Sequence, residues 1–269
     1  MSFSIAGKTA VVTGAANGVG LAIARHFADR DANVVFADID EKKLIEEVGN
    51  ENADDSNVRS FAGDLRQKLT IANLLSATID AFDGVDILVN ASRQMMTADP
   101  LNPEDDAVTT LLNQNLITSL RLSQLFARRM ISQAEKAEQT EGPVGSIINL
   151  SSIAAQRTRP ELLAYSVSSA ALDQMTRSLA VALAPHRIRV NAVAFGSVMS
   201  ASLQGALKEN GDIRDEIIDN TPLHRIASAG ELAEVAQFLA SDGSGFMTGQ
   251  ILTVDGGRTL VDAVEAAAH

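Results

Sequence analysis

The chain has 269 residues, of which 46% are hydrophobic, and a formal net charge of −12 at pH 7. This length and composition suit a globular protein with a sizeable core and exclude an intrinsically disordered chain. The negative charge argues against nucleic acid and anionic membrane surfaces as partners, because both demand clustered lysine and arginine. The absence of cysteine excludes disulfides, thiolate metal sites and a cysteine nucleophile.

Histidines and apolar runs narrow the class of protein further. The four histidines are scattered without metal-ligand spacing, so we expect no metal site; they are His26, His186, His224 and His269. The first residues lack the long apolar core of a signal peptide, and no apolar run approaches membrane-spanning length. We therefore expect a soluble, cytoplasmic protein.

Short apolar runs alternate with longer amphipathic runs along the chain. Seven runs that are apolar on both faces predict buried strands at 8–13, 33–38, 58–63, 85–90, 145–151, 187–193 and 250–256. Helical patterns lie between them at 20–30, 69–82, 107–131 and 171–184. This alternation predicts an α/β fold with a doubly wound (Rossmann) seven-stranded parallel sheet and helices on both faces. The one shift in composition, at 132–145, indicates a surface loop, so we expect residues 1–269 to form a single domain.

The first predicted strand ends in TGAANGVG, Thr13 to Gly20, and a helix follows at once. Gly14, Gly18 and Gly20 permit a tight turn and a close approach of a pyrophosphate to the helix N-terminus. The spacing is not the commoner Gly-x-Gly-x-x-Gly, and a plain turn between strand and helix would also explain these glycines. The order of strand, turn and helix favours dinucleotide binding.

Asp38 closes the second predicted strand, eighteen residues after Gly20. A carboxylate there can accept hydrogen bonds from both adenine-ribose hydroxyls and would repel the 2′-phosphate of NADP. Asn17 offers no positive charge to attract that phosphate. The alternative is that Asp38 caps the helix that begins near Glu41. We expect NAD as the cofactor.

These motifs, taken in order, resemble those of the short-chain dehydrogenases/reductases over nearly the whole chain, from KTAVVTGAANGVG to ILTVDGG at 251–257. The resemblance implies an enzyme that transfers a hydride between a nicotinamide cofactor and a secondary alcohol or carbonyl compound. It implies adenine contacts from Asp64 and Leu65 and a cofactor contact from Asn90, in the stretch NAS. Val198 would supply backbone contacts to the nicotinamide carboxamide.

The same resemblance implies three catalytic residues: Tyr165, the only tyrosine; Ser152, in NLSSIAA; and Asn115, in NQNLITS. Hydride transfer at a carbinol carbon requires that the hydroxyl proton leave, or that a carbonyl be protonated. A phenol can act as that acid or base, and a serine hydroxyl can polarise the substrate oxygen. Asn115 would hold a water in the proton path. Taken singly, Ser152 is also explained as a strand-end serine bonded to backbone, and Asn115 as a polar residue that bends its helix.

The chain departs from the family pattern at three positions around the nicotinamide. Family members carry Tyr-x-x-x-Lys, whereas Ser169 stands four residues after Tyr165. The lysine favours the phenolate and binds the nicotinamide ribose; a serine offers that ribose one hydrogen bond and no charge, so we expect a weakened acid–base site. Ser92 replaces the glycine of Asn-Ala-Gly, and Phe195 replaces the proline usual before Gly196.

Three arginines and one long segment lie near the same expected site. Arg93 could bring a guanidinium into the space that a lysine leaves, although a solvated arginine is the simpler interpretation. Arg157 and Arg159 would either favour an acidic substrate or be ordinary surface residues. We expect residues 197–225 to form a mobile substrate lid, whose composition selects no substrate class.

Two functions remain open. The first is an NAD-dependent oxidoreductase acting on a secondary alcohol or ketone; the second is a catalytically inactive NAD-binding sensor or partner subunit. The retained tyrosine, serine and asparagine favour the enzyme, whereas the missing lysine favours the inactive protein. We also expect a homo-oligomer, and a tetramer as in many relatives, because the helices near 107–131 and 162–184 carry more apolar residues than one sheet face requires.

Overall fold

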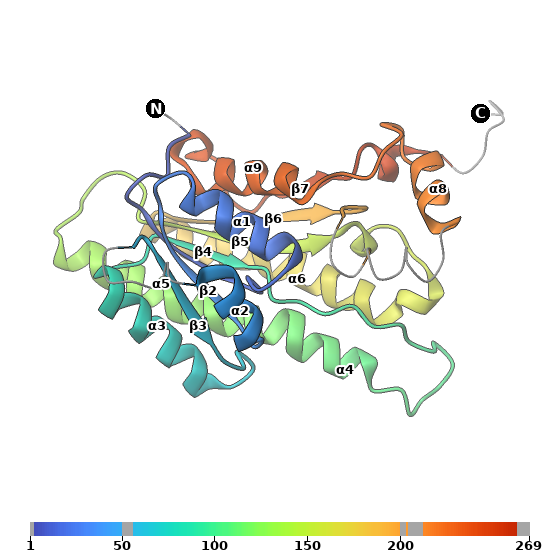
Figure 1. Cartoon of the computed structure of the whole chain (residues 1–269), viewed down its shortest axis with the longest axis horizontal. Coiled ribbons are helices and arrows are strands. Elements are labelled where there is room, and N and C mark those ends of the chain that lie inside the picture. The colour runs from blue at the N-terminus through green and yellow to red at the C-terminus, as the bar shows by residue number, and fades with distance from the viewer. Residues whose placement is uncertain (1–2, 50–55, 200–202, 204–211, 263–269) are drawn as a thin grey trace.

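A computed structural model describes residues 3–49, 56–199, 203 and 212–262. Its strands are β1 Thr9–Thr13, β2 Asn33–Asp38, β3 Val58–Ala62, β4 Ile87–Asn90, β5 Gly145–Ser152, β6 Ile188–Phe195 and β7 Ile251–Val254. They form one parallel sheet in the order β3-β2-β1-β4-β5-β6-β7 (Figure 1). The predicted α/β fold, a doubly wound seven-stranded parallel sheet in a single domain, is confirmed.

Helices cover both faces of the sheet. They are α1 Gly18–Ala28, α2 Glu41–Val48, α3 Lys68–Phe82, α4 Ala107–Leu111, α5 Thr118–Lys136, α6 Leu163–Leu183, α8 Asp212–Asp219 and α9 Ala229–Ala240. Helices α1 and α9 lie on one face, and α3, α5 and α6 lie on the other (Figure 1). Along β1, Val12 packs into the first of these cores and Val11 into the second. Burial on both faces explains why the strands are apolar throughout.

Two helical features differ from the sequence patterns. The predicted run 107–131 is interrupted by a π-helical turn, η2, at Leu112–Ile117. Helix α6 begins at Leu163, as expected for the helix near 162–184, although its amphipathic pattern starts only at 171. Its first turns hold several serines and a valine, which have modest helix propensity, and the packing of Ala164 and Tyr165 against α4 outweighs that preference.

The sheet order places the carboxyl ends of the central strands around one point. The order reverses between β1 and β4, and in open parallel sheets ligands bind in the crevice at such a reversal. The residues that follow β1, β2, β4, β5 and β6 all border the cavity described below. Within the described ranges, no helix is long and apolar enough to cross a membrane.

Candidate active site

A cavity of about 580 Å³ opens at the carboxyl ends of the strands, and this volume suits a cofactor together with a small substrate. Most of the predicted site residues line it: Gly14, Asn17, Gly18, Gly20, Asp38, Asp64, Leu65, Ser152, Tyr165 and Val198. The other three predicted residues are buried and do not line it: Asn90, Asn115 and Ser169.

The turn between β1 and α1 is packed too tightly for side chains. Gly14 has φ +67°, and a Cβ added there would lie 2.7 Å from the carbonyl oxygen of Ala91. A Cβ on Gly20 would lie 2.1 Å from the carbonyl oxygen of Gly14. Helix α1 also carries no acidic residue in its first turn. A backbone cradle that leads into a helix N-terminus is suited to a pyrophosphate.

Asp38 presents a fixed carboxylate to the cavity at the end of β2. The backbone N–H of Ala16 donates to its Oδ2 (3.0 Å), and the N–H of Asp40 donates to its Oδ1 (3.1 Å). The interpretation of Asp38 as a helix cap is wrong, because Asp40 caps α2 by accepting from the Lys43 N–H (3.2 Å). The Asp38 carboxylate is therefore positioned by backbone while it faces the cavity.

Asp64 and Leu65 line the same end of the cavity, after β3. Arg66 holds the Asp64 carboxylate through two hydrogen bonds of 2.8 Å, from Nε and from Nη2. These bonds lower the pKa of Asp64. Arg66 lines the cavity but was not singled out from the sequence, where it follows the predicted adenine contacts directly.

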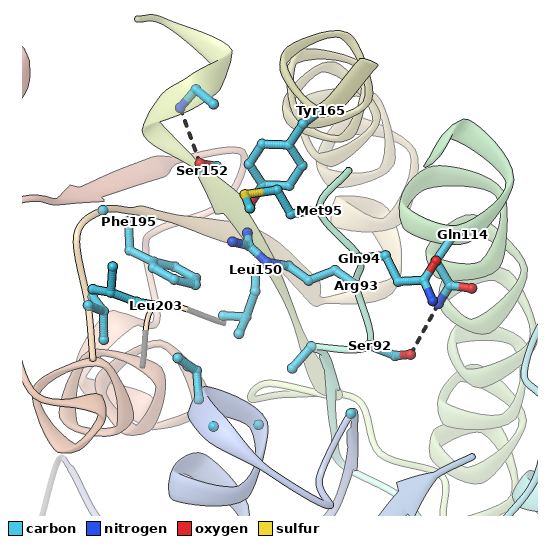
Figure 2. Close-up of a pocket in the computed structure, with 18 of the residues that line it drawn as sticks. Ser92, Arg93, Gln94, Met95, Gln114, Leu150, Ser152, Tyr165, Phe195 and Leu203 are labelled. Atoms are coloured by element: carbon cyan, nitrogen blue, oxygen red, sulfur yellow. Dashed lines mark hydrogen bonds between the residues drawn. The ribbon is translucent and has the colours of Figure 1, made fainter. Parts of the chain in front are cut away.

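Ser152 and Tyr165 both line the cavity, at the end of β5 and in the first turn of α6 (Figure 2). The Ser152 Oγ accepts a hydrogen bond from the Ala154 N–H (3.2 Å). A hydroxyl that accepts from backbone keeps its own proton to donate, so this bond leaves Ser152 able to polarise a substrate oxygen. Tyr165 is buried in a small apolar cluster that includes Ala154 and Leu111.

Arg93 lies between two aromatic rings at this end of the cavity (Figure 2). Its Cζ is 5.3 Å from the Tyr165 ring centroid and 4.4 Å from that of Phe195. Its Nη1 donates to the carbonyl oxygen of Ser151 (2.6 Å). The interpretation of Arg93 as a solvated surface residue is wrong. The preceding residue, Ser92, accepts at its Oγ from the Gln114 Nε2 (3.4 Å).

Asn115 and Asn90 serve the framework behind the cavity wall. Asn115 lies in η2, where its Nδ2 donates to the Gln94 carbonyl (2.9 Å) and to Ser168 Oγ (3.2 Å), and its Oδ1 accepts from the Gln94 N–H (2.9 Å). The amide therefore fixes the loop after β4, and its part in a proton path stays a prediction. The Asn90 Nδ2 donates to Asn149 Oδ1 (2.8 Å), which joins β4 to β5.

After Tyr165, the buried face of α6 carries no positively charged side chain. Ser169 is one turn further along, and Asp173 lies one turn beyond Ser169; both are buried. The Asp173 Oδ1 has no hydrogen-bond partner among the described residues. Burial raises the pKa of the Asp173 carboxyl.

Three further arginines line the cavity near Tyr165. Arg157 is exposed, Arg159 pairs with Glu161 (2.9 Å), and Arg258 donates from Nη1 to Ser197 Oγ (2.8 Å). Among the described residues, the carboxylates that line the cavity are those at the ends of β2 and β3, so at this end the charged lining residues are arginines, one of them paired with Glu161 behind it. Arg258 was not singled out from the sequence, although it follows β7 as the other lining residues follow their strands.

The predicted lid is described only in part. Val198 is buried and forms a parallel bridge with Ala227, and α8 belongs to the described portion. Residues 200–202 and 204–211 lie outside the described residues.

The sequence model of the family described as Enoyl-(Acyl carrier protein) reductase matches residues 14–259. The chain belongs to the short-chain dehydrogenase/reductase family. It is 34% identical, over 97% of its length and 100% of the relative, to the cis-4-hydroxycyclohexanecarboxylate dehydrogenase of Sinomonas cyclohexanicum.

Solved structures of the family resemble this chain closely. A 7α-hydroxysteroid dehydrogenase complexed with NADH and 7-oxo glycochenodeoxycholic acid has a TM-score of 0.86 and 28% identity, over 95% of this chain and 96% of that one. A gluconate 5-dehydrogenase from Burkholderia cenocepacia, in complex with NADP and tartrate, has a TM-score of 0.85 and 28% identity, over 97% of this chain and 98% of that one. This short-chain dehydrogenase/reductase is therefore an oxidoreductase that acts on alcohol or carbonyl substrates with a nicotinamide cofactor.

Proposed function

We propose that the protein is an NAD-dependent dehydrogenase/reductase for a secondary alcohol or ketone. The observation that carries this proposal is the convergence of Tyr165 and Ser152 on one cavity with the glycine turn and the Asp38 carboxylate. Asp38 favours NAD, because a carboxylate held by two backbone amides would accept from the ribose hydroxyls and repel a 2′-phosphate. The glycine cradle fits a pyrophosphate, with Asn17 beside it and Asp64, Leu65 and Val198 along the rest of the cofactor wall.

The side chains of the site supply the proton chemistry. In the oxidative direction, the Tyr165 phenolate accepts the hydroxyl proton of the substrate as the carbinol carbon loses its hydride. In reduction, the phenol returns that proton to the carbonyl oxygen. Ser152 donates a hydrogen bond to the same oxygen and stabilises the charge that develops there. When bound, a nicotinamide accepts or donates the hydride.

We infer that this acid–base pair is weaker than one with a cation on α6. Ser169 stands where the family pattern has lysine, and it offers a ribose one hydrogen bond and no charge. The next buried side chain on this face, Asp173, is a carboxylate whose charge opposes a phenolate. Asn115 and Asn90 contribute to the site through the loop and strand that they fix.

The positive charge around Tyr165 favours a substrate with an acidic group. Arg157 and Arg159 line this end, where no carboxylate is among the described lining residues, although Glu161 pairs with Arg159. The names of the relatives point the same way: a hydroxycyclohexanecarboxylate, gluconate and a glycine-conjugated bile acid all carry a carboxylate. We infer that a hydroxy or oxo acid is a better substrate than the corresponding neutral compound.

The second candidate function is an inactive NAD-binding sensor or partner subunit. The absence of a cation on the buried face of α6 favours it, because without phenolate the proton step is slow. The cavity, the glycine turn and Asp38 would serve this function equally well.

Calorimetry and a turnover assay test these proposals together. NADH should bind more tightly than NADPH, and Asp38→Ala should reduce the difference between the two affinities. The control is Asp40→Ala, which removes a neighbouring carboxylate that does not line the cavity and should leave the preference intact. Equal affinities in the unmodified protein would refute the choice of NAD. Formation of NADH with a panel of hydroxy acids and neutral alcohols tests turnover; tight NADH binding with no turnover would identify the inactive protein.

A further inference from the structure

A phenol that acts as a base needs a nearby positive charge, and α6 does not supply one. The four residues after Tyr165 on this helix are Ser166, Val167, Ser168 and Ser169. The described side chain that brings a cation onto the Tyr165 ring is Arg93, which comes from the loop after β4 (Figure 2).

The Arg93 guanidinium is held by groups that leave its charge uncompensated. Its Nη1 donates to the neutral Ser151 carbonyl, and the Phe195 ring lies beside its Cζ. Arg93 is in none of the ion pairs among the described residues. A cation over an aromatic face is attracted by the ring, and the attraction grows when the site excludes water.

We propose that Arg93 is the cation of this active site and stabilises the phenolate form of Tyr165 from the face of its ring. The inference rests on the proposed role of Tyr165 as the acid or base. Ionisation of a phenol spreads negative charge from the oxygen into the ring carbons. A guanidinium over the ring therefore interacts more strongly with phenolate than with phenol, which is the difference that base catalysis requires.

Phe195 is a positioning residue in this arrangement. Its ring centroid lies 4.4 Å from the Arg93 Cζ, closer than the Tyr165 ring at 5.3 Å, so two aromatic rings contact the cation. Two of the departures from the family pattern thereby act together with Arg93: Phe195 holds the guanidinium, and the neutral Ser169 avoids repulsion between two cations.

The other charged side chains around the phenol are those of Arg157, Arg159 and Arg258, which line the cavity, and of Glu161, which is paired with Arg159. On α6, burial raises the pKa of the Asp173 carboxyl. None of these side chains is a phenol, so a titration followed by the absorbance of phenolate reports Tyr165.

The sequence offers a direct measurement of that ionisation. Tyr165 is the only tyrosine and the chain has no tryptophan, so the near-ultraviolet difference spectrum of phenolate reports this side chain alone. Titrating the protein without cofactor, with circular dichroism to confirm folding, gives the ionisation midpoint. Arg93→Met should raise the midpoint by about one pH unit. This is the low end of the shift that a neighbouring charge produces, because the cation lies over the ring and not beside the oxygen. Arg93→Lys should restore part of the shift, since lysine itself titrates near pH 10.4.

Matched variants make the result decisive. Arg157→Met removes another arginine that lines the cavity but does not contact the ring, and it should leave the midpoint unchanged. Phe195→Leu, which removes the supporting ring, should raise the midpoint less than Arg93→Met, and it tests the proposal if Arg93→Met does not fold. An unchanged midpoint in the folded Arg93 or Phe195 variant would overturn the proposal, as would an equal rise in Arg157→Met.

Turnover separates this inference from the proposed function. With an active substrate, Arg93→Met should lower kcat about tenfold and move the pH–rate profile to higher pH. A rise in KM confined to acidic substrates, with no spectroscopic shift, would make Arg93 a substrate anchor and overturn the proposal. A spectroscopic shift in a protein that turns over no substrate would contradict the proposed function and leave the role of Arg93 standing.

Discussion

Placing a lysine at position 169 tests whether charge on α6 limits the reaction. Residues four apart on a helix lie about 6 Å apart. At that distance and an effective dielectric constant of about 20, an ammonium would stabilise a phenolate by about 3 kcal/mol. This energy corresponds to about two pH units, or about a hundredfold more phenolate at neutral pH.

Two features of the structure reduce the expected gain in rate. Asp173 lies one turn beyond Ser169 and would compete for the ammonium. A phenolate that forms more readily is also a weaker base. We therefore expect Ser169→Lys to raise kcat/KM about tenfold at pH 7 and to move the pH–rate profile to lower pH, with a larger gain in the Arg93→Met background.

The assay measures kcat/KM against pH with a confirmed substrate, and NADH affinity by calorimetry. The control is Ser169→Met, which adds comparable bulk without charge and should give no gain. Tyr165→Phe in the Ser169→Lys background should remove the gain. If Ser169→Lys binds NADH normally and turns over no faster than Ser169→Met, charge on α6 does not limit the reaction.

Three further predictions concern stability and assembly. Asp173→Asn should raise the free energy of unfolding at pH 7 by about 1 kcal/mol, because it removes an incompletely bonded buried carboxylate. Burial raises the pKa of Asp173 in the fold, so the destabilisation by its buried charge disappears when the carboxyl is protonated. Thermal melts should therefore show the stability gain of Asp173→Asn shrinking as the pH falls into the acid range. Hydrogen bonds from Arg225 lower the pKa of Glu231 from 4.5 to about 2, so Glu231→Gln should lower stability at pH 7 by roughly 0.2–1 kcal/mol, and the difference should close as the pH falls from 4.5 toward about 2. Light scattering at micromolar concentration should give the mass of a homotetramer, since α6 exposes Leu163 and Val167; a monomer mass would contradict this expectation.

The sheet and the cofactor turn were predictable from the sequence because their causes are local. Strands buried on both faces must be apolar at successive positions, as at Val11 and Val12. The glycines at 14 and 20 stand where a Cβ would strike backbone, and this need for space leaves a direct mark on the sequence.

The position of Arg93 could not be predicted in the same way. Whether an arginine after β4 meets solvent or the cavity depends on Phe195 and Tyr165, which come from distant parts of the chain. The alternative role of Asp38 as a helix cap failed for a smaller reason: Asp40, two residues further on, is the cap, and only the position where β2 ends shows this. Local patterns predict backbone, whereas side-chain direction depends on tertiary neighbours.

The two hydrogen bonds between the Asn115 side chain and the Gln94 backbone affect how the site can move. One amide side chain satisfies both the N–H and the carbonyl of Gln94, as a neighbouring strand would, so the backbone next to Arg93 is anchored before any ligand binds. Movement of the cation during a catalytic cycle is then a change of side-chain rotamer rather than a displacement of the loop. Such a change must break the Arg93 hydrogen bond to the Ser151 carbonyl and its contact with Phe195, so these two contacts set how readily the charge leaves Tyr165.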